Sequence, residues 1–152
     1  MKIIIEDNFL EKNECDLAIN FYEKNLERVK SFRDVFPLDL KPKDEPIYFI
    51  IKKLQKFVEK LNHTVDWTQI VKWPTHSFQN LHFDDASDLT TFSSILYLND
   101  DFEGGQTYFK DGTIIKPIKG RALFFDGNFY KHGVKQVDKN TRYVIATWYK
   151  KL

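Results

Sequence analysis

The sequence predicts a mainly β domain in which two helices come before a core built from two β-sheets. Up to about residue 63, apolar residues recur at every third or fourth position, which is the period of one helix face. From there on the period changes, and about eight short β-rich segments follow, punctuated by Gly, Asp, Asn or Pro. That spacing is typical of a sandwich or a barrel. A chain of 152 residues is expected to form one domain, with 1–63 as helical support and 64–152 as the β core.

The first third predicts a short edge strand at 2–5 and then a helix. Asn13 can cap this helix, and acidic residues follow it in the first turn, where they favour the helix dipole. The apolar face of the helix consists of Cys15, Ala18, Tyr22, Leu26 and Val29.

The next segment, 31–45, contains two prolines and mixed charges, and it is interpreted as a loop. Pro46 suits the first position of a second helix, because its missing N–H has no helical partner there. The apolar face of this helix consists of Ile47, Ile50, Leu54, Phe57, Val58 and Leu61. We expect both helices to pack on the outer face of one sheet.

The β-rich segments are short and evenly spaced. Gly104 and Gly105 fall between two of them and indicate a turn, because glycine tolerates a positive φ. The predicted strands are 65–73, 77–83, 91–98, 107–109, 113–118, 122–125, 133–137 and 142–149.

Composition excludes some classes of function. Lys plus Arg is 23 and Asp plus Glu is 22, so the net charge of +1 disfavours a nucleic-acid partner. The N-terminus MKIIIEDNFL resembles neither a signal peptide nor a membrane anchor, and no run is apolar enough to span a bilayer. The single cysteine, Cys15, fits a reducing compartment and a buried structural thiol. We expect a soluble cytoplasmic protein.

A histidine and a carboxylate stand together in the stretch NLHFDD. His82 and Asp84 are two residues apart, so on a strand they would project from the same face and could both ligate a metal. A third ligand must come from elsewhere, and His63, His76 and His132 are the candidates. His132 is the best placed, because a late strand can lie beside an early one in a double-sheet fold. Two histidines and one carboxylate form the facial triad of non-haem Fe(II) oxygenases.

An isolated His-x-Asp is weak evidence, and the final strand adds to it. Arg142 lies in the apolar run TRYVIATWY, on a face that is otherwise apolar. A buried guanidinium needs an anion, because an unpaired buried charge is costly. A dicarboxylate ligand would supply one through a bidentate contact, and a structural aspartate is the alternative. By alternation, this face of the strand carries Arg142, Val144, Ala146 and Trp148.

Six motifs in order resemble the prolyl 4-hydroxylase family of 2-oxoglutarate/Fe(II)-dependent dioxygenases. They are HFD, SSILYLND, FEGGQTYF, IKPIKGRALFF, KHGV and TRYVIATWY, and the resemblance covers about residues 66–149. It implies a double-stranded β-helix, a cupin-like jelly roll, which agrees with the strand pattern. It also implies Fe(II) and 2-oxoglutarate, with O2 as cosubstrate and ascorbate as a possible reductant.

The resemblance also assigns residues. His82, Asp84 and His132 match the iron ligands. Arg142 matches the basic residue that binds the distal carboxylate of 2-oxoglutarate, and Tyr97 matches a tyrosine that shares it. Two further positions also match: Thr107, beside the cosubstrate, and Trp148, an aromatic that lines the pocket near the iron.

Two departures concern the substrate. Gln79 stands where many relatives have a tyrosine, and no arginine precedes the YLN segment. The resemblance implies hydroxylation of a prolyl residue in a peptide or protein. Hydroxylation of another side chain, a free amino acid or a small metabolite stays open, as does a silent jelly-roll binding module. A nucleic-acid demethylase is disfavoured by the balanced charge.

Overall fold

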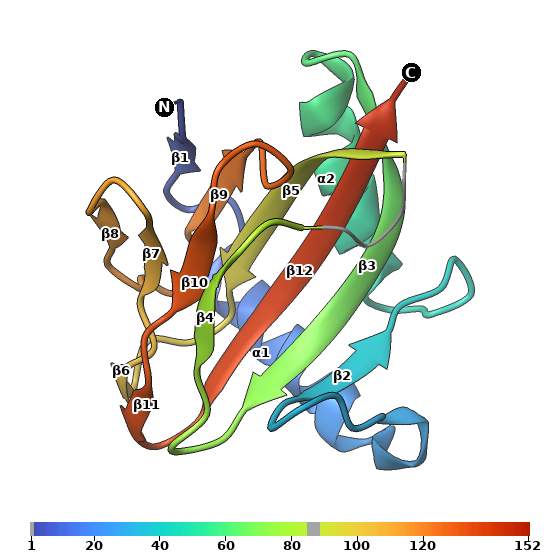
Figure 1. Ribbon diagram of the computed structural model, residues 1–152. Helices are drawn as coiled ribbons and strands as arrows, with labels where there is room; N and C mark the ends of the chain where they lie inside the picture. Colours follow the sequence, from blue (N-terminus) through green and yellow to red (C-terminus); the bar gives the residue numbers. More distant parts are fainter. Residues whose placement is uncertain (1, 85–88) are drawn as a thin grey trace.

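The computed structural model describes residues 2–84 and 89–152. Within these residues the chain forms two α-helices, one short 3-10 helix and twelve strands (Figure 1). All strand pairs are antiparallel. Neither helix is long and apolar enough to cross a bilayer, as judged over the described residues.

The strands form two main sheets that face each other. The larger sheet has the order β1 (Ile4–Glu6), β9 (Ala122–Phe125), β5 (Thr90–Tyr97), β12 (Arg142–Lys151), β3 (His63–Trp73) and β2 (Phe36–Asp39). The smaller sheet has the order β4 (Gln79–His82), β10 (His132–Val134), β7 (Thr107–Phe109) and β8 (Ile114–Ile115). A two-stranded ribbon pairs β11 (Val137–Lys139) with β6 (Glu103–Gly104). The predicted double-stranded β-helix is thereby confirmed.

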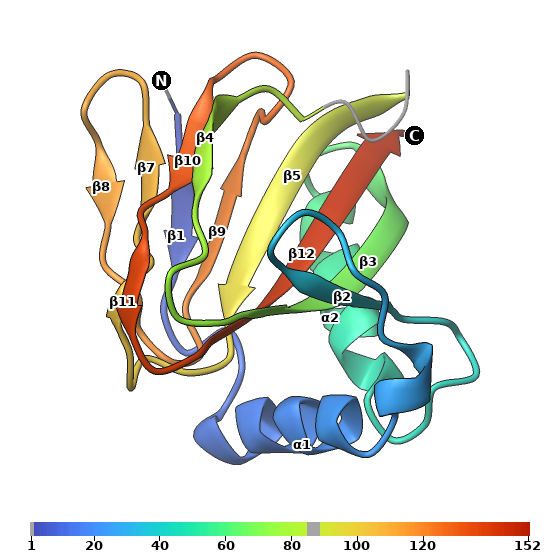
Figure 2. The same ribbon diagram turned by 60° about the horizontal axis from the view of Figure 1, so that its bottom comes forward.

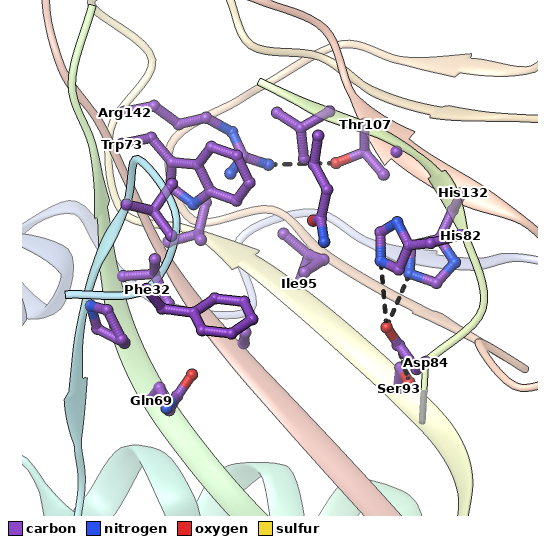
Figure 3. A pocket seen from close by; sticks show the side chains of 18 of the residues that line it. Phe32, Gln69, Trp73, His82, Asp84, Ser93, Ile95, Thr107, His132 and Arg142 are labelled. Atoms are coloured by element: carbon purple, nitrogen blue, oxygen red, sulfur yellow. Dashed lines mark hydrogen bonds and ion pairs between the residues drawn. The ribbon is translucent and has the colours of Figure 1, made fainter. Parts of the chain in front are cut away.

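The helices and the smaller sheet lie on opposite sides of the larger sheet (Figure 2). The space between the two sheets holds an apolar cluster to which both contribute, with Phe109 and Val134 from one side and Phe125 and Val144 from the other. The same space opens into a pocket (Figure 3). The interior of the β core is therefore divided between packing and a binding cavity.

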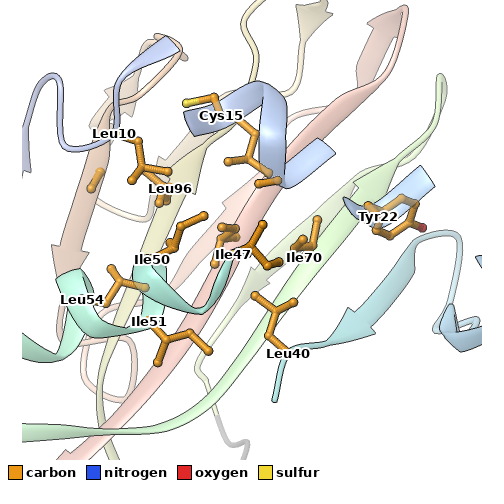
Figure 4. Close-up of a cluster of buried hydrophobic side chains, with 14 of the residues drawn as sticks. Leu10, Cys15, Tyr22, Leu40, Ile47, Ile50, Ile51, Leu54, Ile70 and Leu96 are labelled. Atoms are coloured by element: carbon orange, nitrogen blue, oxygen red, sulfur yellow. The ribbon is translucent and has the colours of Figure 1, made fainter. Parts of the chain in front are cut away.

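The outer face of the larger sheet is covered by α1 (Lys12–Glu23) and α2 (Tyr48–Glu59), as the sequence predicts (Figure 4). Ile50 and Leu54 of α2 pack with Leu96 and Ile145 of the sheet, and all four are fully buried. Cys15 of α1 belongs to this cluster too, and burial raises the pKa of its thiol to about 11. This confirms the prediction of a buried structural thiol.

Strand β12 contributes side chains to both apolar clusters, the one between the sheets and the one under the helices. Val144 and Ala146 face the pocket side, whereas Ile145 and Tyr149 face the helices. Side chains on a strand alternate between faces, so a strand buried on both sides is apolar throughout. The predicted division of this strand into two faces is confirmed.

The predicted bounds of the first helix are wrong at both ends. The Glu11 carbonyl accepts the first helical hydrogen bond from Cys15, and the Glu11 N–H donates to Glu14 Oε1 at 2.9 Å. Glu11 and Glu14 form a capping box, in which each side chain faces the backbone N–H of the other residue. The N-cap is therefore Glu11 rather than Asn13. At the other end, Asn25 donates its side-chain amide to the Phe21 carbonyl at 2.7 Å, and the helix stops at Glu23. A 3-10 turn, Leu26–Arg28, follows.

The segment 31–45 is not entirely a loop, because it contains β2. Pro37 lies within this strand and misled the prediction, yet β2 is an edge strand, where a residue without an N–H is tolerated. Pro46 is not the first helical residue either. It lies in a turn in which the Ile47 N–H donates to the Asp44 carbonyl, and α2 begins at Tyr48.

The predicted β segments agree closely with the observed strands. The segments 107–109 and 122–125 match β7 and β9 in full, whereas 133–137 divides between β10 and β11 and 113–118 is reduced to β8. The predicted edge strand is confirmed as β1. Gly104 and Gly105 have φ of 74° and 67°, so the predicted turn requirement is confirmed.

The helix-to-sheet core is expected to dominate stability. Leu54→Ala should lower the free energy of unfolding by about 2–5 kcal/mol, because the cavity cannot collapse fully in a closely packed cluster. Urea titration followed by circular dichroism measures this. Lys56→Ala, on the exposed side of the same helix, is the matched control and should change stability by less than about 0.5 kcal/mol. Equal losses in the two variants would contradict the assignment of this core.

Candidate metal and cosubstrate site

Three predicted ligands converge at one end of the pocket. His82 of β4 and His132 of β10 are direct cross-strand partners, and Asp84 lies two residues beyond the first of them. Asp84 Oδ1 is 3.1 Å from His132 Nε2 and 3.5 Å from His82 Nε2. The ligand atoms all lie within 4.8 Å of one another (Figure 3). The structure thus brings together the three residues that the sequence proposes as a metal site.

Both histidines are oriented by the same local contact. His82 Nδ1 lies 2.8 Å from the Asn80 carbonyl and His132 Nδ1 lies 3.0 Å from the Tyr130 carbonyl. A carbonyl can only accept, so each Nδ1 carries the proton and donates it. Nε2 is then the nitrogen that faces Asp84: its N–H can donate to the carboxylate, and once it is deprotonated its lone pair can bind a metal.

The electrostatics of the cluster favour an ionised carboxylate. Burial raises the pKa of Asp84, but hydrogen bonds from His132, His82 and Ser93 outweigh it and hold the pKa well below its ordinary value. Burial lowers the pKa of His82, whereas its contacts with Asp84 and the Asn80 carbonyl raise it. The increase is larger than the decrease, so the pKa of His82 lies above its ordinary value. The cluster is therefore built around one negative charge facing two nitrogen donors, a set that suits a divalent transition metal.

The two alternative histidines are placed elsewhere. His76 is exposed, and its backbone N–H donates to the Val137 carbonyl. The ring nitrogens of His63 contact the Leu61 carbonyl and Thr91 Oγ1. His132 is therefore the third member of the cluster. Asp85, which we expect to point away from the metal, lies outside the described residues.

Arg142 lies at the opposite end of the pocket and is fully buried (Figure 3). Its guanidinium carbon lies 4.9 Å from the Trp73 ring and 5.4 Å from the Tyr97 ring. Its Nη2 donates weakly to Thr107 Oγ1 at 3.4 Å, whereas Nε and Nη1 have no partner. Desolvation lowers the pKa of Arg142, and Tyr97 opposes that shift. The structural aspartate considered as an alternative is not found among the described residues.

Thr107 and Tyr97 surround the guanidinium. Thr107 is buried on β7, and its hydroxyl shares a hydrogen bond of 2.5 Å with Tyr97 Oη. Thr107 Oγ1 is therefore in contact with both Tyr97 and Arg142. Their predicted roles toward a carboxylate stay predictions, but the two hydroxyls and the unpaired guanidinium nitrogens form one polar group at this end of the pocket.

Trp148 lines the pocket, and its predicted role beside an iron stays a prediction. It is paired across the sheet with Ser93, which contacts Asp84, and its ring stacks at a tilt against Trp67 with centroids 4.9 Å apart. Ala146 and Val144 continue the same face toward Arg142. The wall of the pocket between the metal end and the arginine end is therefore apolar.

Sequence reasoning did not find several residues of the site. Trp73 stacks on Arg142, and its buried Nε1–H has no partner. Ser93 contacts Asp84, and a tight turn that includes Phe32 and Arg33 contributes to the lining. Counting alternate positions back from Tyr97 places Ser93 on the pocket face, but no sequence signal pairs it with Asp84. Gln79, one of the two departures from the family pattern, also lines the pocket.

The residues present fit Fe(II) and a dicarboxylate keto acid. Two imidazole nitrogens and one carboxylate oxygen lie within 4.8 Å of one another, and a two-histidine, one-carboxylate donor set suits Fe(II). The unpaired donors of Arg142 demand an anion in the same pocket. Both requirements are met by one ligand with a metal-binding group at one end and a carboxylate at the other.

Comparison with known proteins agrees with this geometry. The family model of the 2OG-Fe(II) oxygenase superfamily matches residues 68–150, a range that holds every residue of the candidate site from His82 to Trp148. The match covers more than half of the chain. The chain therefore belongs to the 2OG-Fe(II) oxygenase superfamily, whose members use iron and 2-oxoglutarate.

Individual relatives are prolyl hydroxylases by name. Prolyl 3-hydroxylase 1 of Gallus gallus is 45% identical over 65 residues, which cover 38% of this chain and only 9% of that protein. The viral collagen prolyl hydroxylase of Paramecium bursaria Chlorella virus-1 has a TM-score of 0.80 at 22% identity, covering 100% of this chain and 97% of that chain. A Pseudomonas putida prolyl-4-hydroxylase also has a TM-score of 0.80, at 18% identity, covering 99% and 92%. These two structures share the fold of this chain.

Proposed function

We propose that this chain is an Fe(II)/2-oxoglutarate-dependent dioxygenase that hydroxylates a prolyl residue in a peptide or protein. The observation that carries the proposal is a fully buried arginine without an anion, in the same pocket as a His-Asp-His cluster. A buried arginine alone could bind many anions, and a His-Asp-His cluster alone could hold a structural metal. Together, they define a site for a metal and for a ligand that carries a carboxylate at its far end.

The chain's own residues position the reactants. His82, His132 and Asp84 would hold Fe(II), which when bound supplies the activation of O2 coupled to decarboxylation of 2-oxoglutarate. Arg142 would bind the distal carboxylate of the cosubstrate, with Thr107 and Tyr97 beside it. Val144 and Ala146 of β12 and Ile95 of β5 line the space between these two groups, and apolar side chains there disfavour water, which strengthens the polar contacts. The protein thus contributes the orientation of the cosubstrate and the exclusion of water from the site.

The proposed substrate class rests on the relatives. One is named for hydroxylation at the 3-position of proline, one for the 4-position, and one for collagen. A peptidyl proline is common to these names, whereas the ring carbon is not. The products of a peptide hydroxylation assay identify the oxidised carbon.

The test is a gain of one oxygen on a proline-containing peptide. The protein would be incubated with Fe(II), 2-oxoglutarate, ascorbate and air, together with a Pro-Pro-Gly repeat peptide or its alanine-substituted counterpart. We expect a mass increase of one oxygen on the proline peptide alone, with one succinate formed per oxygen gained. Hydrolysis and separation of 3-hydroxyproline from 4-hydroxyproline would identify the carbon.

The other outcomes separate the alternatives. If the protein forms succinate but oxidises no proline peptide, peptidyl proline is excluded as the substrate. Another side chain, a free amino acid or a metabolite would then be favoured. Absence of succinate with any substrate, despite metal binding, would favour a silent binding module and contradict the proposed activity.

A further inference from the structure

The two oxygens of Asp84 have different partners. Oδ1 faces the Nε2 atoms of His132 and His82, at 3.1 and 3.5 Å. Oδ2 accepts a hydrogen bond of 2.6 Å from the Ser93 hydroxyl. Asp84 lies beyond the end of β4, so no strand ladder orients it, and its backbone N–H donates instead to the Gly127 carbonyl at 2.8 Å. Its orientation therefore depends on Ser93 and Gly127.

Ser93 is well placed to make this contact. It lies on the inner face of β5, is 2% exposed, and donates across the pocket wall to the carboxylate. A hydroxyl that donates to an ionised carboxylate makes a short, strong hydrogen bond. The contact is thus suited to hold one carboxylate oxygen in a fixed place.

Gly127 supplies the room for this pair. A Cβ at this position would lie 2.4 Å from Asp84 Oδ2 and 2.5 Å from Ser93 Oγ, so no side chain can be accommodated there. The φ of Gly127 lies outside the positive range, so space and not backbone conformation accounts for the glycine. It belongs to a turn in which Asp126 Oδ1 accepts the N–H groups of Asn128 and Phe129.

A carboxylate can bind a metal through one oxygen or through two. If both oxygens of Asp84 bound the ion, the second would take a coordination position that the keto acid or O2 needs. We propose that Ser93, with the space left by Gly127, positions Asp84 as a one-oxygen metal ligand and thereby keeps a coordination position free for the cosubstrate. This inference rests on the proposed function and names the residues that set the coordination of its metal.

Ser94 is a matched control for Ser93. It is also a buried serine of β5, but it points to the opposite face and its hydroxyl bonds Tyr149 Oη at 2.7 Å. Ser93→Ala and Ser94→Ala each remove one hydrogen bond made by a buried serine hydroxyl of the same strand. Only the first changes the contacts of Asp84, so a purely structural effect would appear in both variants.

The experiment measures binding without turnover. Metal-free protein would be titrated with Co(II) alone, and the Co(II)-loaded protein would then be titrated with 2-oxoglutarate while its visible spectrum is recorded. For Ser93→Ala we expect an altered Co(II) spectrum and a loss of 2-oxoglutarate affinity on the order of 10- to 100-fold. Ser94→Ala should match the wild type, and Ser93→Thr, which keeps the hydroxyl, should restore most of the affinity.

A second variant tests the space at residue 127. Gly127→Ala should displace Asp84 and weaken Co(II) binding, and the melting temperature of the metal-free protein reports whether the fold survives. Wild-type spectrum and affinities in Ser93→Ala would overturn the inference, as would equal losses in Ser93→Ala and Ser94→Ala. By contrast, a wild-type protein that binds Co(II) but not 2-oxoglutarate would contradict the proposed function, and the Co(II) spectra would still decide the role of Ser93.

Discussion

Replacement of Asp84 by alanine is expected to abolish succinate formation and to weaken metal binding by more than about 100-fold. Loss of a residue that only orients a metal ligand already lowers metal affinity by about 10- to 100-fold, and Asp84 is a proposed ligand itself. Asp84 supplies the only carboxylate of the cluster found among the described residues. Without it, two imidazoles face each other with no anion to balance a divalent ion. His82→Ala and His132→Ala should act in the same direction, because each removes an Nε2 donor. Calorimetric titration with Co(II) and a succinate assay with Fe(II) measure both effects.

His76→Ala is the matched control for these histidine variants. It removes an imidazole that is exposed and lies outside the cluster, so metal affinity and turnover should stay at wild-type levels. A variant of Asp84, His82 or His132 that kept wild-type turnover would remove that residue from the metal site. A large loss of metal affinity in His76→Ala would require a different set of ligands.

Replacement of Arg142 by alanine is expected to raise the 2-oxoglutarate concentration needed for half-maximal turnover by about 100-fold. Loss of one partner of a buried charge pair costs about 2–5 kcal/mol, and about 2.7 kcal/mol corresponds to that factor. Co(II) affinity should be unchanged, because Arg142 lies at the other end of the pocket from the three ligands. The two titrations separate cosubstrate binding from metal binding.

Arg121→Ala is a suitable control for the loss of a cation. Its guanidinium pairs with Asp7 at the surface, so its removal changes net charge equally without touching the pocket. An unchanged dependence on 2-oxoglutarate in Arg142→Ala would remove Arg142 from the proposed role. An equal change in Arg121→Ala would indicate a general electrostatic effect instead.

Much of the β core could be predicted because its periodicity is local. The apolar run of β12 and the segments 107–109 and 122–125 carry their strand signal in adjacent residues. The errors fall where a local pattern is ambiguous. The N-cap at Glu11 depends on a reciprocal contact with Glu14, and β2 contains a proline that only an edge position permits.

The candidate site also contains residues that a local pattern predicts and residues that depend on contacts between distant segments. His82 and Asp84 are two residues apart in the sequence, so their proximity could be inferred locally, although Asp84 lies beyond the end of β4 and is held by other contacts. His132 is 50 positions after His82 by residue number. The sequence favours it over His63 and His76 because a late strand can lie beside an early one in a double-sheet fold, but only the structure shows that β4 pairs with β10 at these two residues.

The residue types of the site, their order along the chain and the alternation that directs them inward can all be inferred from the amino-acid sequence. Three features emerge only from the folded chain: Arg142 is buried without a carboxylate partner among the described residues, Trp73 covers it, and Ser93 donates to one oxygen of Asp84. The physical reason is that alternation sets the face of a strand on which a side chain lies. Which side chains meet across that face depends on the register and packing of strands that are distant in sequence.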